Sequence, residues 1–165
     1  FMYMISGYDK TLTKLFYCFA LNAFLIYLTA TQEFSINKIG FFITILGFQI
    51  FLLSTLFSLF QKDEIDCTLF HKIFPYQKHV KYFKEVTFIF LLFLYSNTLF
   101  LFYLITENRA LFVVIFPLIL SSFLPFTLNR FLYKLSLRLC LFTSLMSSVF
   151  WMVIQYFLIG VLLEY

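Results

Sequence analysis

Charge is scarce in this sequence, and its scarcity decides the class of protein. Asp, Glu, Lys and Arg make up 12% of the 165 residues, whereas 62% are hydrophobic and 24% are aromatic. A soluble globular domain carries about 25% charged and about 45–50% apolar residues. The composition therefore excludes an ordinary soluble domain and predicts an integral membrane protein.

Paired cysteines, linkers and catalytic motifs are also missing. Cys18, Cys67 and Cys140 have no paired spacing, so neither a disulfide framework nor a zinc site is predicted. His71 and His79 have no third ligand near them, so we expect no metal, haem or other cofactor. No Gly/Ser-rich or Pro-rich linker, catalytic triad or phosphate-binding loop occurs. We expect one transmembrane domain over residues 1–165, with no catalytic residues.

Five apolar runs without charged residues make up most of the sequence. Each approaches the ~18–20 residues that a helix needs to cross a hydrocarbon core about 30 Å thick. Backbone groups in lipid must be satisfied within their own segment, so the fold class predicted is an all-α, polytopic transmembrane helix bundle. Pro117 and Pro125 lie in the fourth run, which should kink or end early near Pro125. The predicted spans are residues 15–30, 41–60, 86–105, 111–128 and 139–163.

Side-chain amides are the strongly polar groups inside these runs, which contain no Asp, Glu, Lys, Arg or His. The lack of ionisable groups argues against a proton relay or an ion path. The alternatives for the amides are hydrogen bonds between helices and the lining of a substrate path. We favour the first, because bundle interiors use amides chiefly as contacts between helices. The four residues are Asn22, Gln49, Asn97 and Gln155.

Lys and Arg are distributed unequally between the two sides that five spans would create. The N-terminal segment and the loops after the second and fourth spans hold ten of the twelve, and the other side has Lys38 and Arg109. By the positive-inside rule, the N-terminus should face the cytoplasm or the mitochondrial matrix. The ten are Lys10, Lys14, Lys62, Lys72, Lys78, Lys81, Lys84, Arg130, Lys134 and Arg138.

The segment 61–85, which we call the polar loop, holds nine of the twenty charged residues and both histidines. Asp63, Glu64 and Asp66 are suited to the start of a helix. Leu69, Phe70, Ile73 and Phe74 would share one face of that helix, with His71 and Lys72 on the other face. Pro75 would end it. We predict a short amphipathic helix lying at the membrane interface, followed by a basic stem that leads into the third span.

The same segment, FQKDEIDCTLFHKIFPYQKHVKYFKE, resembles the loop after the second span of ABC-2-type permeases. Among these, it is most similar to cytochrome c maturation protein B (CcmB), the membrane subunit of a haem-handling ABC transporter. The matching positions are Asp66, Thr68, Leu69, Pro75 and Lys84, with looser similarity over 24–105 and 134–158. Cys67 stands where the family usually has Gly, and five spans are predicted where the family has six.

The resemblance implies a coupling helix that docks on a separate ATPase subunit, which makes this chain a non-catalytic permease subunit. The partner-docking residues would be Asp63, Glu64, Asp66, Thr68, Leu69, His71, Lys72, Pro75 and Lys84.

The alternative function is a mitochondrially encoded structural subunit of a respiratory complex or ATP synthase. The abundant Phe, Leu, Ile and Tyr suit AT-rich codons, and no import signal precedes the first span, so we expect a mitochondrial or bacterial inner membrane. In both functions the partners would be other membrane subunits. Anionic lipid such as cardiolipin suits the basic side better than nucleic acid does.

Overall fold

A computed structural model of the chain is helical in nearly every part that it describes. The exceptions are the turns at Thr55–Leu56 and at Ser122. The described residues are 8–31, 36–58, 60, 78–107, 109–132 and 137–163. The prediction of an all-α bundle is thus confirmed for this part of the chain.

The described residues contain six named helices, and most begin earlier than the apolar runs suggested, because polar residues continue the helix at the ends of the spans. Four stretches, α2, α6, the α7–α8 pair and α9, are long and apolar enough to cross a membrane, as an integral membrane protein requires. The helices are α2 (Tyr8–Thr31), α3 (Ile36–Ser54), α6 (Lys78–Glu107), α7 (Arg109–Ser121), α8 (Phe123–Leu132) and α9 (Leu137–Leu163).

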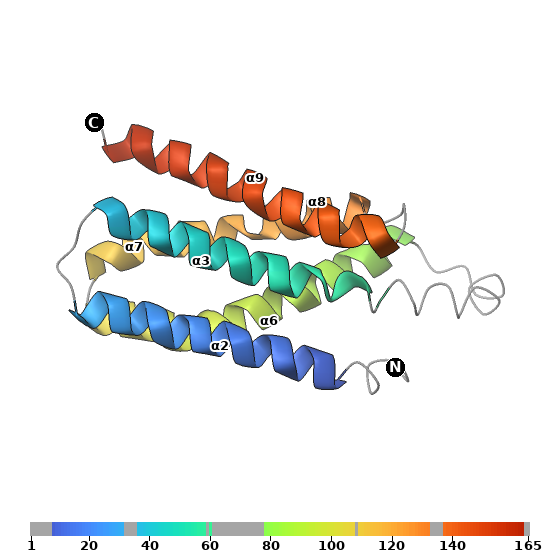
Figure 1. Ribbon diagram of the computed structural model, residues 1–165, viewed down its shortest axis with the longest axis horizontal. Helices are drawn as coiled ribbons and strands as arrows, with labels where there is room; N and C mark the ends of the chain where they lie inside the picture. Colours follow the sequence, from blue (N-terminus) through green and yellow to red (C-terminus); the bar gives the residue numbers. More distant parts are fainter. Residues whose placement is uncertain are drawn as a thin grey trace.

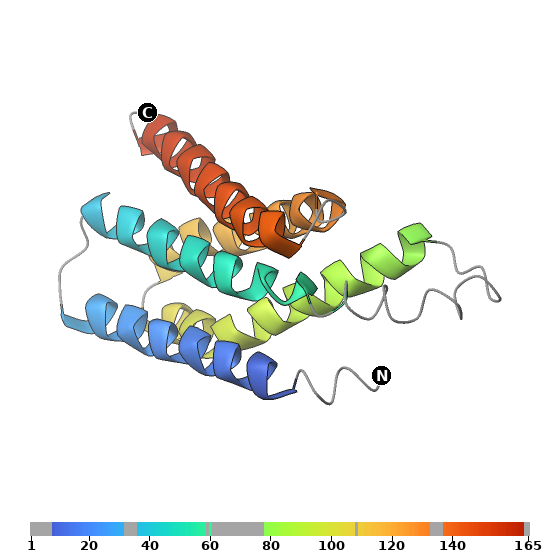
Figure 2. The same cartoon turned by 45° about the vertical axis from the view of Figure 1, so that its right-hand side comes forward.

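The helices run back and forth along one axis (Figure 1). The start of α2, the end of α3, the start of α6, the end of α8 and the start of α9 lie at one end, which we call the basic end. The principal packing partners are α3 with α9 and α2 with α6. Figure 2 shows α6 extending past the neighbouring ends of α2 and α3, and α9 diverging from α3 toward its C-terminus.

The second predicted span, 41–60, is wrong in its boundaries, since α3 runs from Ile36 to Ser54. Its continuous apolar part, Ile39–Ser54, is shorter than the four long apolar helices. The α-helical pattern gives way where Leu56 donates to the carbonyl of Leu53, a bond with the tighter spacing of a 3₁₀ turn. The described residues therefore contain four long apolar stretches where five spans were predicted, and α3 holds the shorter fifth one.

The fourth predicted span is interrupted, as its prolines suggested, but the break precedes Pro125. Proline lacks an N–H, and its ring clashes with the carbonyl four residues earlier, which here belongs to Ser121. The chain turns at Ser122, whose N–H donates to the carbonyl of Ile119 at 3.2 Å. The helix resumes as α8 instead of ending. Pro117 is accommodated inside α7.

Aromatic side chains fill the contacts between the helices. Phe93 of α6 meets Phe126 of α8 edge-to-face, with ring centroids 5.7 Å apart, and Phe42 of α3 packs against Phe100 of α6. Many more large apolar side chains point outward, including Phe157, which is 70% exposed. Such an apolar exterior suits a lipid environment, because in water it would be a large aggregation-prone patch.

A glycine permits the closest approach between α3 and α9. A Cβ placed on Gly47 would come closer to Cγ and Sδ of Met152 than real Cβ atoms come to other atoms. At Gly40, a Cβ would meet Cε2 of Tyr156 at 3.7 Å, an ordinary van der Waals distance. A side chain at Gly47 would thus require the side chain of Met152 to move, whereas a methyl group is tolerated at Gly40.

We predict that Gly47→Val lowers the free energy of unfolding by about 1–3 kcal/mol, the usual cost of overpacking a core. Thermal unfolding of the purified protein in detergent measures the loss. Gly40→Ala is the matched control and should have little effect, whereas Met152→Ala should restore part of the stability of the Gly47 variant. Equal losses for the two glycine variants would contradict the proposed close approach.

Candidate functional site

Three buried amides from three helices form a continuous hydrogen-bonded chain in the core. Nδ2 of Asn97 donates to Oε1 of Gln49 at 3.0 Å, and Nε2 of Gln49 donates to Oδ1 of Asn22 at 2.9 Å. Nδ2 of Asn22 then donates to the carbonyl oxygen of Ser96 at 2.6 Å. The chain therefore leaves α6, passes through α3 to α2, and returns to α6.

This chain accounts for three of the four amides that the sequence singled out. The structure brings Asn22, Gln49 and Asn97 together, and all three are buried. Gln155 lies apart from them in α9, also buried, at 8% exposure. The described contacts use the three clustered amides to join helices, since each makes a hydrogen bond to another helix.

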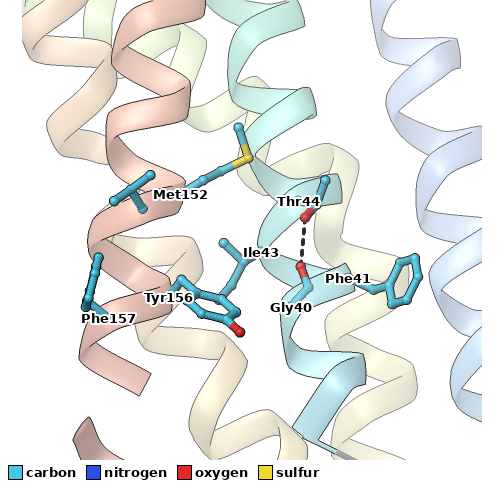
Figure 3. A pocket seen from close by; sticks show the side chains of 8 residues that line it. Gly40, Phe41, Ile43, Thr44, Met152, Tyr156 and Phe157 are labelled. Carbon is cyan, nitrogen blue, oxygen red and sulfur yellow. Dashed lines mark hydrogen bonds between the residues drawn. The ribbon is translucent and has the colours of Figure 1, made fainter. Parts of the chain in front are cut away.

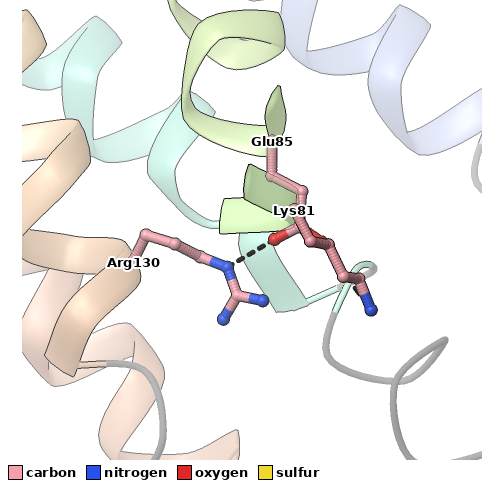
Figure 4. Close-up of polar contacts among 3 residues, drawn as sticks. All are labelled: Lys81, Glu85 and Arg130. Carbon is pink, nitrogen blue, oxygen red and sulfur yellow. Dashed lines mark hydrogen bonds and ion pairs between the residues drawn. The ribbon is translucent and has the colours of Figure 1, made fainter. Parts of the chain in front are cut away.

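A buried ion pair lies at the basic end of the bundle (Figure 4). Nε of Arg130 in α8 donates to Oε2 of Glu85 in α6 at 2.5 Å, and the two residues are 2% and 6% exposed. The guanidinium also lies 4.0 Å from the ring centroid of Tyr82, a cation–π contact. Lys81 approaches the other carboxylate oxygen of Glu85 at 4.0 Å.

This pair was not predicted from the sequence pattern. The pattern indicated a loop cation at Arg130, but Arg130 lies within α8 and is buried, and Glu85 lies within α6 just before the predicted start of the third span. The positions of Glu85 and Arg130 at the ends of neighbouring spans could have indicated the pair. The third and fourth runs form a hairpin, so the start of one and the end of the other should lie at the same level, with opposite charges facing each other.

Most of the predicted docking residues fall outside the described residues. Asp63, Glu64, Asp66, Thr68, Leu69, His71, Lys72 and Pro75 belong to this group, as does the predicted interfacial helix. Lys84 is described, and it lies on an exposed face of α6 near the basic end. The stem predicted to lead into the third span is part of α6 itself, which begins at Lys78.

A groove of about 630 Å³ lies between α3 and α9 (Figure 3). It is lined by Gly40, Phe41, Ile43 and Thr44 on one side and by Met152, Val153, Tyr156 and Phe157 on the other. The hydroxyl of Thr44 is already engaged, since it donates to the carbonyl of Gly40 at 2.8 Å. The described lining holds no ionisable group other than the phenol of Tyr156, which suits contact with apolar chains.

Among the described residues, no group of three or more His, Cys, Asp or Glu is placed to hold a metal ion. Cys18 is buried in the apolar core among neighbouring helices. No protein-family model, curated protein or solved structure matches the chain. The two polar clusters, the amide chain and the buried ion pair, are therefore the basis for a functional interpretation.

We predict that Gln49→Leu lowers the free energy of unfolding by about 1–3 kcal/mol, because it leaves Oδ1 of Asn22 buried without its donor. Reversible unfolding in mixed micelles measures this loss. Gln155→Leu is the matched control, since it makes the same change in α9 away from the amide chain, and it should cost less. An equal or larger loss of stability for Gln155→Leu would contradict a stabilising role for the amide chain.

For the ion pair, Glu85→Ala alone should cost about 3–5 kcal/mol, because it leaves the buried guanidinium of Arg130 without its carboxylate. The double variant Glu85→Leu with Arg130→Met should recover most of that loss, since it removes both charges together. The same unfolding assay compares the three proteins. A double variant as unstable as the single one would contradict a paired, buried geometry.

Proposed function

We propose that this chain is a non-catalytic integral membrane subunit of a larger complex, with the permease subunit of a CcmB-like ABC transporter as the closest functional model. Its described part would form the membrane bundle, whose helices are joined by the amide chain and the buried ion pair. The polar loop at the basic end would dock a separate soluble ATPase subunit. Catalysis would then belong to that partner.

The observation that carries the proposal is the connection between the polar loop and the bundle. Residues 78–85 of the polar loop form the first turns of α6, whose 30 residues span about 45 Å, well beyond a hydrocarbon core of about 30 Å. The first turns of α6 carry Lys81, Lys84 and Glu85, and Glu85 is bonded to Arg130 of α8. A displacement applied to the loop would therefore reach two membrane helices at once.

Charge at this end supports a docking role. The exposed face of α6 presents Lys84. Interfaces with soluble partners commonly combine aromatic side chains with a charged rim, and the sequence of the polar loop offers both. The five-span topology, with its N-terminus on the cytoplasmic or matrix side, follows from the ten-to-two distribution of Lys and Arg and belongs to the same proposal.

The experiment is isolation of the complex from native membranes in a mild detergent, with crosslinking from Cys67 in the polar loop. We expect a crosslink to an ATPase subunit. Asp66→Lys should weaken that association, and more strongly at low salt, because exposed charges are screened within about 10 Å at ordinary ionic strength.

Asp9→Lys is the matched control, because it reverses a charge at the same end of the bundle but outside the polar loop. Its complex should remain intact. Co-isolation with cytochrome or quinone-reducing subunits, without an ATPase, would overturn the permease proposal in favour of a structural respiratory subunit.

A further inference from the structure

Hydroxyl groups in the described helices generally donate to a carbonyl three or four residues earlier, as Thr29 does to Leu25. Ser54, Thr87 and Ser144 are exceptions whose buried hydroxyls have no hydrogen-bond partner in the described part of the chain. Asn129 is more unusual, because its side-chain nitrogen and oxygen both lack partners. Asn97 also has one unpartnered oxygen, but its nitrogen belongs to the amide chain.

Ser54, Asn129 and Ser144, from three different helices, lie at nearly the same level of the bundle. In the antiparallel pair α3–α9, Gly47 lies beside Met152. Seven residues farther along α3 is Ser54, and the position seven residues before Met152 on α9 adjoins Ser144. Seven residues make about two helical turns, so the two hydroxyls lie within about one turn of each other along the axis.

The contacts of α8 place Asn129 at this level too. Nε1 of Trp151 in α9 donates to Oγ of Ser121 at 3.0 Å, just before α8 begins. Asn129 lies about two turns after Ser121, and Ser144 lies about two turns before Trp151 on the antiparallel α9, so both residues lie at a similar level.

We propose that Ser54, Asn129 and Ser144 line an internal site that binds a small cluster of water molecules. Ser54, Asn129 and Ser144 are 0% exposed, so bulk solvent does not satisfy their polar atoms. A buried water typically makes about three hydrogen bonds to such otherwise unsatisfied groups. The site offers an amide donor, an amide acceptor and two hydroxyls, all uncharged, which water matches and which an ion of either sign would match only in part.

With this hydrated site, α8 would be held to its neighbours by one direct ion pair and by contacts through water. The guanidinium of Arg130 joins the helix directly to α6. Asn129 next to it would contact α3 and α9 through water. The break at Ser122 bounds the helix at its other end. A short helix held in this way can shift without breaking a direct hydrogen bond from Asn129.

Water-edited solid-state NMR of the protein in lipid bilayers, with labelled asparagine, tests the site directly. Magnetisation should pass from water to the side-chain amide of Asn129 several-fold faster than to that of Asn22. Asn22 is the internal control, because Ser96 and Gln49 occupy its donor and acceptor. Transfer to Asn129 as slow as transfer to Asn22 would overturn the proposal.

The sign of a stability change provides a second test. Asn129→Leu replaces the amide with an apolar group of similar size, which would raise the melting temperature if the site were dry, since it removes unpaired polar atoms. A water-filled site predicts a fall instead, and a smaller additional fall when Ser144→Ala is combined with it, because both side chains share the same water. A raised melting temperature, or strictly additive effects, would contradict the proposal.

Discussion

A polar side chain surrounded by hydrocarbon must find its hydrogen-bond partners within the protein, and the rest of this bundle depends on how Gln49 meets that requirement. Its amide accepts from Asn97 and donates to Asn22, so one side chain joins α3 to both α2 and α6. Aromatic and aliphatic packing supplies most of the buried area. It does not by itself fix the register of these helices as a hydrogen-bonded chain does, because lipid tails are as apolar as the side chains.

The second polar cluster has a different role at the basic end. Glu85 and Arg130 are buried, and such a pair is costly to break but contributes little net stability compared with apolar residues of the same size. The pair attaches α6, whose first turns belong to the polar loop, to α8, which the break at Ser122 separates from α7. Under the proposed function, docking at the loop would therefore displace both helices.

The sequence predicted the helical class and the locations of the apolar segments, because hydropathy over about twenty residues is a strong signal. It predicted a disruption near Pro125, but the steric clash acts four residues earlier, at Ser121, and this displaces the break. It missed the Glu85–Arg130 pair, since charges at span ends look like loop charges until a neighbouring helix covers them. The four amides were visible as residues, but which helices they join depends on register, which composition does not encode.

Solid-state NMR contacts between side-chain amides in lipid bilayers test the central claim most directly. With asparagine and glutamine labelled, the side chain of Gln49 should show contacts to both Asn22 and Asn97, at distances that match hydrogen bonds of 2.9 and 3.0 Å. Contacts from Gln49 to lipid acyl chains, with none to the two asparagines, would contradict the claim that this amide chain holds α2, α3 and α6 together.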